Sequence, residues 1–261
     1  MTRVHTKRRA DAPAGFFEAE AAGLRWLAEA GGARVVEVLA VEPGRIDLAA
    51  LAIDRPTALH ARALGGDLAV THDAGARAFG VPPGDWAGPT FIGNQRLSTR
   101  TEGWPAWGAF YCAERVVPYA ERAAERGAIG GSDLRLLREA CDRLASGDLD
   151  DGEPAARLHG DLWNGNVQWT ADGAVLIDPA ASGGHRETDL AMLALFGCPH
   201  LAEVYAGYRA QHPLRPGWED RIGLHQLHPL AVHAASHGPT YAPPLVAAAR
   251  SVLDLPAAPG G

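Results

Sequence analysis

The segment 158–178 (LHGDLWNGNVQWTADGAVLID) carries three polar side chains whose types and spacing could do chemistry. Asn166 follows Asp161 by five positions, and Asp178 follows Asn166 by twelve. Between Asn166 and Asp178, an alternating strand, a turn at Asp172 and Gly173, and an apolar strand predict a hairpin. Because the chain reverses near Asp172, we expect Asp178 to return to the side of Asn166, roughly 4.5–5.5 Å away. Asp161 lies on the loop that leads in.

Carboxylate and carboxamide oxygens are the ligands that Mg²⁺ takes from proteins, usually together with substrate phosphates. The second carboxylate, Asp161, stays free to accept a proton from an attacking hydroxyl. This order of parts is typical of kinase-type phosphoryl transfer: a loop Asp, an Asn five residues on, and a metal-binding Asp after a hairpin. The alternative is a surface hairpin with ordinary turn residues. The combined spacing favours the chemical interpretation.

A second candidate pair involves the single lysine of the chain. Of the 24 lysines and arginines only Lys7 is a lysine, and it lies in a predicted strand, residues 2–9. A helix is predicted from 17 to 30, with Glu20 on its apolar stripe. A carboxylate on a core-facing stripe needs a partner. A Lys7–Glu20 pair is the arrangement that directs a kinase lysine toward nucleotide phosphates. Alternatively, Glu20 reaches solvent at the edge of the stripe.

The remaining pattern predicts a small strand-rich lobe followed by a larger helical one. A change of composition at 54–56 marks the expected boundary between them. Pro118 predicts a kink or a break in the helix pattern of 107–126. The predicted strands are 35–41 and 46–53; the predicted helices are 58–64, 67–79, 107–126, 132–145 (capped by Ser132 or Asp133) and 188–196, with a helical bundle to 255 and a loop at 81–90.

Composition excludes several classes of protein. The formal charge of −7, with no basic block beyond 7–9, argues against a nucleic-acid groove. No apolar run is long enough to span a membrane, and the start lacks the apolar core of a signal peptide. The three cysteines are widely spaced without a CxxC pair, which favours reduced thiols in the cytoplasm. His233 and His237 have the spacing of helical metal ligands, but helix-face residues are the favoured interpretation.

Several motifs together resemble the fructosamine (ketosamine) kinases, relatives of the aminoglycoside and choline kinases. The resemblance covers nearly the whole chain. The matching stretches are FFEAEAAGL (16–24), FIG (91–93), the helix with Trp107, Phe110, Glu114 and Arg115, HGDLWNGN (159–166), LIDPA (176–180), GHRETDLAMLALFG (184–197) and WEDRIGLHQLHPLAVHA (218–234). It implies an α+β, bilobal protein-kinase-like fold with a nucleotide-binding lobe at 1–55 and a catalytic and substrate lobe at 56–261.

The resemblance also implies roles for individual residues. Asp161 would be the catalytic base, Asn166 and Asp178 the Mg²⁺ ligands, and Lys7 with Glu20 the phosphate lysine and its partner. Three further residues would assist: His159 would support the catalytic loop, Asp189 would brace it, and Trp163 would either pack against the sugar or shape the loop. Backbone groups of 46–53 would face adenine.

The implied function is ATP-dependent phosphorylation of the sugar 3-hydroxyl of ketosamines, such as fructosyl- or ribulosyl-amines, free or protein-bound. ATP and Mg²⁺ would be required, with no nucleic-acid or membrane partner, and the oligomeric state stays open. One departure matters: the Gly-rich hairpin that precedes the lysine strand in this family is missing, so we expect either a true start upstream or a truncated small lobe. The alternatives are an aminoglycoside- or choline-type phosphotransferase, or a pseudokinase that only binds.

Overall fold

The computed structural model describes residues 3–257 and divides them into two compact units. One unit consists of the chain up to 103 together with 155–214, and the other of 104–154 together with 215 onward. The first unit contains every strand of the described chain, and both units contain helices. None of the described helices is long and apolar enough to cross a membrane.

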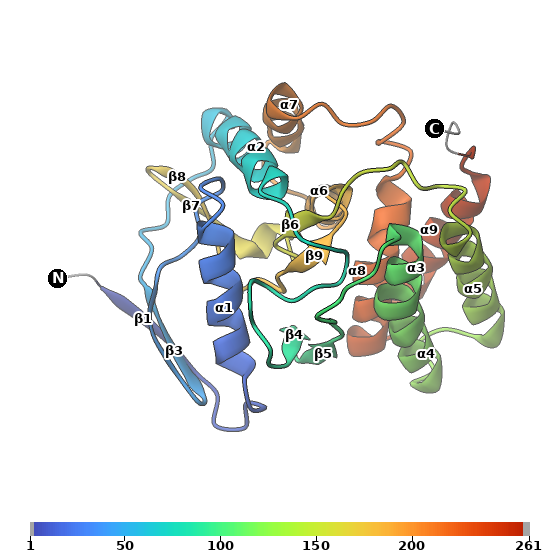
Figure 1. Cartoon of the computed structure of the whole chain (residues 1–261), viewed down its shortest axis with the longest axis horizontal. Helices are drawn as coiled ribbons and strands as arrows, with labels where there is room; N and C mark the ends of the chain where they lie inside the picture. The colour runs from blue at the N-terminus through green and yellow to red at the C-terminus, as the bar shows by residue number, and fades with distance from the viewer. Residues whose placement is uncertain (1–2, 258–261) are drawn as a thin grey trace. The chain divides into compact units, whose positions relative to one another are not determined.

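A three-stranded antiparallel sheet and one helix carry the predicted lysine pair. The sheet has the order β1 (Val4–Arg8), β3 (Arg45–Ala49) and β2 (Val38–Glu42). Helix α1 (Phe16–Ala28) lies beside this sheet (Figure 1) and contacts β2 and β3. The predicted stripe is buried, with Phe17 and Leu24 packed against Ile46 and Leu48 of β3. The periodicity of the sequence therefore placed Glu20 on the correct face.

Helix α2 (Ala58–Asp73) corrects the prediction of two helices at 58–64 and 67–79. It runs without interruption through Gly65, and it packs against α7 (Leu201–Gln211). A Cβ at Gly65 would collide with the carbonyl oxygen of Val204. The glycine therefore permits close approach of two helices and does not end one.

The segment that carries the candidate site consists of short strands around tight turns. Strand β6 (Ala156–Leu158) pairs with β9 (Ser182–Gly184), and a 3₁₀ turn (Asn164–Asn166) precedes the hairpin of β7 (Val167–Thr170) and β8 (Gly173–Leu176). The predicted hairpin is confirmed, but its register is shifted by one residue. Asn166 O accepts a hydrogen bond from Ile177 N at 3.0 Å, so the residue opposite Asn166 is Ile177 and not Asp178.

Two elements of this unit complete the surroundings of the site. Helix α6 (Glu187–Leu195) follows β9, close to the predicted bounds of 188–196. A hairpin of β4 (Thr90–Ile92) and β5 (Gln95–Leu97) follows the predicted loop at 81–90 and was not predicted.

The second unit is helical. Its elements are α3 (Trp107–Phe110), a π-helical turn (Tyr111–Val116), α4 (Val117–Glu125), α5 (Gly131–Ala145), α8 (Ile222–His237), a 3₁₀ turn (Pro239–Tyr241) and α9 (Ala242–Asp254). The helix pattern predicted for 107–126 runs without a gap from Trp107 to Glu125, and near Pro118, where a kink or break was predicted, α-helical hydrogen bonding is replaced by the π-helical turn that ends at Val116. The N-cap of α5 is Gly130, whose N–H donates to Asp133 Oδ2, and not Ser132 or Asp133.

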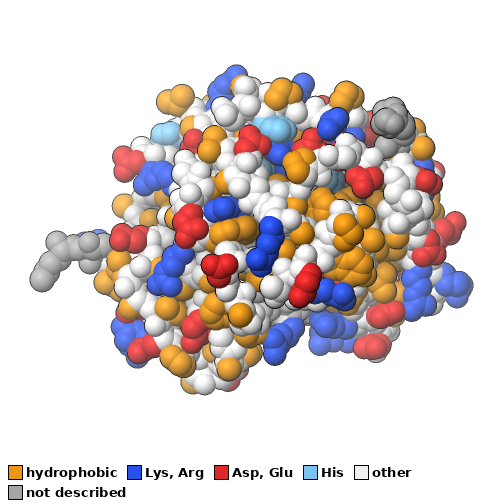
Figure 2. All heavy atoms as spheres, in the orientation of Figure 1, with side chains coloured by type: hydrophobic (Ala, Val, Ile, Leu, Met, Phe, Trp, Pro, Cys, Tyr) orange, Lys and Arg blue, Asp and Glu red, His pale blue; other side chains and the backbone are white. Residues whose placement is uncertain are grey.

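Surface charge and cysteines agree with the composition. On the face drawn in Figure 2, acidic and basic side chains are interspersed. Cys112, Cys141 and Cys198 are free thiols, and all three are buried. His233 uses Nδ1 for a 2.7 Å hydrogen bond to the carbonyl of Pro229 within α8, as an ordinary helix residue does.

Candidate active site

A cleft of about 510 Å³ in the first unit collects most of the predicted site residues. Its walls are contributed by β1, α1, the β4–β5 turn and the segment 161–181. The predicted residues that line it are Lys7, Glu20, Asp161, Trp163, Asn166 and Asp178. His159 and Asp189, the other two predicted residues, are almost fully buried, beneath the loop that carries Asp161. One cleft therefore brings together residues separated by more than 150 positions in the chain.

Lys7 lies between two carboxylates. Its Nζ is 2.8 Å from both carboxylate oxygens of Glu20 and 2.7 Å from Oδ1 of Asp178. Burial lowers the pKa of the Lys7 ammonium, but the charges of Glu20 and Asp178 outweigh this, and the pKa is raised above its ordinary value. Burial also raises the pKa of Glu20, against the effect of Lys7. Lys7 is therefore held charged and in one direction, pointing at the end of β8.

Asp178 has an unusual backbone conformation. Its φ is +53°, one of two positive values among the non-glycine residues of the described chain. This region disfavours most L-residues, although Asp tolerates it better than branched side chains do. The turn follows directly on β8 and precedes Pro179. It leaves the Asp178 side chain half exposed in the cleft, with Oδ1 on Lys7.

The carboxamide of Asn166 donates hydrogen bonds to Asp161. Nδ2 of Asn166 donates to the Asp161 carbonyl at 2.7 Å, to Asp161 Oδ2 at 3.2 Å and to the Asp178 carbonyl at 3.4 Å. Burial raises the pKa of Asp161 to about 6, since the Asn166 hydrogen bond offsets it only in part. A carboxylate with that pKa is ionised at neutral pH and is basic enough to accept a proton.

Two oxygen donors at this end of the cleft are not used by the contacts described above. Asn166 donates through Nδ2 and Asp178 contacts Lys7 through Oδ1, so these contacts do not involve Asn166 Oδ1 or Asp178 Oδ2. Mg²⁺ prefers such oxygen donors and retains several waters. The donor set therefore fits a magnesium ion that is shared with a substrate.

Hydrogen bonds of the buried His159 side chain hold the loop before Asp161 in place. His159 Nε2 donates to the carbonyl of Ile177 at 2.9 Å, while Nδ1 accepts from Asp161 N at 3.3 Å. Burial lowers the pKa of His159, which keeps the ring neutral and consistent with one donor and one acceptor nitrogen. Gly160 adopts φ +81°, and a Cβ there would collide with the Ala180 carbonyl. Only glycine fits this turn.

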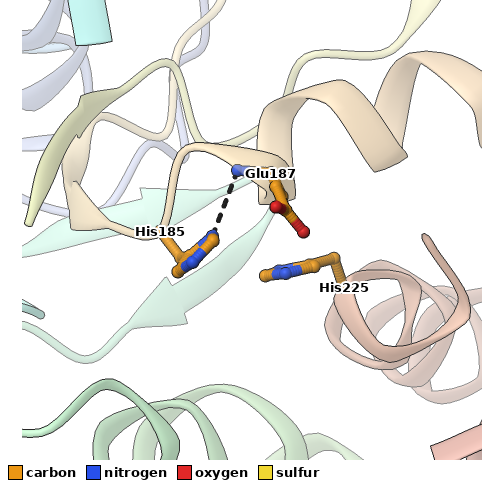
Figure 3. Close-up of side chains that lie close together, drawn as sticks. All are labelled: His185, Glu187 and His225. Carbon is orange, nitrogen blue, oxygen red and sulfur yellow. Dashed lines mark hydrogen bonds between the residues drawn. The ribbon is translucent and has the colours of Figure 1, made fainter. Parts of the chain in front are cut away.

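Asp189 holds the backbone of the same loop. It accepts hydrogen bonds from His159 N at 2.7 Å and Gly160 N at 2.9 Å. It lies in the first turn of α6, where a negative charge is favoured by the helix dipole. His185 contributes to the start of this helix, because its Nδ1 accepts from the backbone N–H of Glu187 at 3.2 Å (Figure 3).

Trp163 forms part of the open side of the cleft. Its side chain is 40% exposed and meets the Phe196 ring edge-on at 6.1 Å. A half-exposed aromatic pair offers an apolar platform beside Asp161.

Sequence reasoning missed the opposite wall, formed by the turn of the β4–β5 hairpin. Gly93 and Asn94 of this turn line the cleft, and Arg9 donates to Asn94 Oδ1 at 2.8 Å. The Arg9 guanidinium also lies over the Phe16 ring, 5.1 Å from its centroid. The signal was present, since Gly93-Asn94 is a dipeptide typical of a two-residue hairpin turn.

Comparison with known proteins agrees with this geometry. The family profile described as fructosamine kinase matches residues 2–254. A probable ketoamine kinase from Vibrio parahaemolyticus serotype O3:K6 is 32% identical over 247 residues, which are 86% of this chain and 76% of that protein. A crystal structure of a fructosamine-3-kinase candidate from Thermobifida fusca YX-ER1 is 44% identical with a TM-score of 0.90, covering 97% of this chain and 86% of that one.

A more distant structure identifies the fold. A choline/ethanolamine kinase family protein from Mesorhizobium loti aligns over 97% of this chain and 83% of its own, with a TM-score of 0.58 at 18% identity. At that identity the likeness concerns the fold alone. The α+β, protein-kinase-like fold expected from the sequence is confirmed.

Proposed function

Because this chain belongs to the fructosamine kinase family, a family of ATP-dependent kinases, we propose that it phosphorylates the 3-hydroxyl of a ketosamine. The acceptor would be a fructosyl- or ribulosyl-amine, free or on a protein lysine, which would make the reaction a step of protein deglycation. The observation that carries the proposal is the position of Asp161, basic and half buried, in one cleft with Lys7, Asn166 and Asp178.

In the proposed step the sugar hydroxyl oxygen forms a bond to the γ-phosphorus of ATP. The bond from that phosphorus to the β–γ bridging oxygen breaks, and the hydroxyl proton passes to Asp161. A positioned base of this kind typically contributes about 10²–10⁴-fold. The hydrogen bonds from Asn166 Nδ2 leave Asp161 Oδ1 without a partner among the described residues, so this oxygen is available to the hydroxyl.

The phosphate end would be served by Lys7, which Glu20 directs toward Asp178. Asn166 Oδ1 and Asp178 Oδ2 would hold Mg²⁺, which neutralises charge on the phosphate oxygens when bound. Catalysis at such a site depends mainly on positioning and on electrostatic stabilisation. The two hydrogen bonds to Glu20 fix the lysine for this purpose before ATP arrives.

The acceptor end would be formed by Trp163, whose exposed ring can pack against the apolar face of a sugar. His159 would act only through the loop, because its ring is buried and both its nitrogens are used. The three free, buried cysteines suit a reducing compartment, so the cytoplasm remains the proposed location.

One architectural expectation belongs to the proposal. We place the boundary between a nucleotide-binding lobe, 1–55, and a catalytic lobe, 56–261, at the chain's change of composition. The described sheet of the proposed nucleotide lobe is the three-stranded β1-β3-β2.

The test is ADP formation from Mg-ATP with a fructosyl- or ribulosyl-lysine derivative, in wild type, Asp161→Asn and the exposed-turn control Asp172→Asn. We expect turnover in wild type and in Asp172→Asn, and a loss of about 10²–10⁴-fold in Asp161→Asn with ATP binding retained. Equal turnover in all three would reject Asp161 as the base. Mg-dependent ATP binding without turnover on any ketosamine would favour a pseudokinase, and turnover on choline or an aminoglycoside instead would reassign the acceptor.

A further inference from the structure

Behind the catalytic loop lies a buried group of polar side chains that the proposed chemistry does not use. Its members come from three helices: His72 from the end of α2, Arg186 and Asp189 from the start of α6, and Tyr208 from α7. All four are at most 3% exposed. Burying this many polar groups is costly unless each is paired. Their pairing is continuous.

The contacts form a continuous series of hydrogen bonds that ends at the catalytic loop. Arg186 Nη1 donates to the Tyr208 hydroxyl at 3.2 Å, and this hydroxyl is 2.8 Å from His72 Nδ1. His72 Nε2 is in turn 3.2 Å from Asp189 Oδ2. Asp189 is the carboxylate that accepts the backbone N–H groups of the loop before Asp161.

Asp189 and Arg186 lie at the two ends of this series, and their chemistry determines which group donates in every hydrogen bond. An ionised Asp189 can only accept, so His72 Nε2 must donate. Burial lowers the pKa of His72, which keeps the ring neutral, and Nδ1 is then an acceptor. Tyr208 must therefore donate its hydroxyl proton to Nδ1. The oxygen of Tyr208 is left to accept from Arg186, which has only donors.

The same contacts explain how Asp189 stays ionised in the interior. Burial raises its pKa, but the hydrogen bonds from His72 and from the N–H of Gly160 act against burial, and the pKa lies below its ordinary value. With the donor at Nε2, all three donors to Asp189 are satisfied at once. A His72 with its proton on Nδ1 would place a lone pair against the carboxylate and remove one of them.

We propose that His72 and Tyr208 are positioning residues of the phosphotransfer: Tyr208 fixes the tautomer of His72, and His72 fixes the carboxylate that holds the loop of Asp161. The inference rests on the proposed function, since it concerns the loop that carries the base. Neither residue touches the cleft, and both act through Asp189. Helix α7 is thereby connected to the catalytic loop through side chains and not through the backbone.

The chain offers a matched pair of substitutions that separates positioning from packing. The amide nitrogen of His72→Gln can reach the place of Nε2 and keep the donor to Asp189, whereas that of His72→Asn reaches only the place of Nδ1. Both variants lose the ring and its packing. Because a hydrogen bond to a charged group is the difference between them, kcat should fall about 10- to 100-fold in His72→Asn and clearly less in His72→Gln. The KM for ATP should stay unchanged in both.

A second pair uses two tyrosines of α7. Tyr208→Phe removes the hydroxyl that bonds His72, and Tyr205→Phe removes a hydroxyl that donates to the Leu190 carbonyl at 3.2 Å, outside the chain of contacts. We expect Tyr208→Phe to lower kcat without changing the KM for ATP. Tyr205→Phe should leave both constants near those of wild type.

Amide hydrogen exchange gives a readout that does not require activity. Exchange at residues 159 and 160 should be faster in His72→Asn and Tyr208→Phe than in wild type, His72→Gln and Tyr205→Phe. Equal kcat and equal exchange in the Gln and Asn variants, or equal effects of the two tyrosine substitutions, would overturn the proposal. A wild type without activity on any acceptor would contradict the proposed function instead, while the exchange measurement would still decide the positioning.

Discussion

Asp161 and Asp189 are two carboxylates on either side of one loop, and their environments are opposite. Asp189 is 1% exposed and accepts from two backbone N–H groups and one imidazole, and these donors keep its pKa below the ordinary value despite burial. Asp161 is half buried in the cleft and receives a single side-chain hydrogen bond, so burial raises its pKa to about 6.

The contrast between these two carboxylates explains how one loop can be both rigid and reactive. A carboxylate whose acceptors are all used stabilises its ionised form and holds backbone in place. A carboxylate with an unused oxygen and a raised pKa remains able to take a proton. Substitution of Asp189 tests the carboxylate that holds the backbone, and substitution of Lys7 tests the ammonium in the cleft. Substitution of Gly160 tests the turn between the two carboxylates, and substitution of Asp161 tests its own charge.

Asp189→Asn should have the largest effect on stability. The NH₂ group of the introduced amide must face one of the three groups that donate to Asp189. Buried N–H groups are then left unpaired. We expect the free energy of unfolding to fall by roughly 3–5 kcal/mol, measured by urea denaturation. Asp172→Asn in the exposed hairpin turn is the control. A loss below about 1 kcal/mol would mean that the loop does not depend on this carboxylate.

Lys7→Met should reduce activity more than stability. The only ammonium that faces Asp178 is removed from the described cleft, and kcat/KM should fall by about 10²–10³-fold in an ADP-release assay. Arg25→Met, which removes an exposed cation from α1, controls for net charge. An equal loss in both variants would point to overall charge and not to Lys7.

Gly160→Ala tests the turn between the two carboxylates. Its Cβ would meet the Ala180 carbonyl, whereas Gly147, with a similar φ of +88°, has nothing within 4 Å of such an atom. Gly147→Ala therefore measures the cost of the left-handed backbone alone. Gly160→Ala should be less stable than this control by about 1–3 kcal/mol, by urea denaturation. Equal losses would show that the turn can move away from Ala180.

The smallest effect concerns the charge of Asp161. Its pKa in the folded protein is about 6, above the ordinary carboxyl value, so ionisation destabilises the fold as pH rises between about 4 and 6. Asp161→Asn should therefore match wild type at pH 4 and exceed its Tm by about 2 °C at pH 8, in calorimetry without ligand.

Activity gives the same residue a second signature. In wild type, kcat/KM should rise as pH increases through about 6, because Asp161 must be ionised to accept a proton. An acid limb centred below pH 4 would mean that burial does not raise this pKa.

Local patterns were sufficient to predict the parts of the site that lie on single elements. The apolar stripe of α1 placed Glu20 toward the sheet, where it pairs with Lys7, and the Asp172-Gly173 turn predicted the hairpin. The one-residue error in register arose because the pairing of β7 and β8 brings Ile177 opposite Asn166. The left-handed φ of Asp178 then directs its side chain to Lys7, and no local sequence pattern predicts such a conformation.

The contacts behind the loop could not be predicted for a different reason. Tyr208 and His72 are 136 residues apart, and Asp189 lies 117 residues from His72. Contacts of this kind depend on how α2, α6 and α7 pack, and each residue by itself looks like an ordinary helix residue. The close approach of α2 and α7 occurs at Gly65, between the two separate helices that were predicted at 58–64 and 67–79.

The position of Lys7 also affects how the protein itself reacts with sugars. A reducing sugar condenses with an unprotonated amine, and Lys7 is the only lysine side chain in the chain. Its pKa is raised and its ammonium is enclosed by Glu20 and Asp178, both of which reduce its nucleophilicity. The chain therefore offers glucose and ribose no reactive lysine, and its single lysine side chain should resist glycation in solutions where the lysines of other proteins are modified.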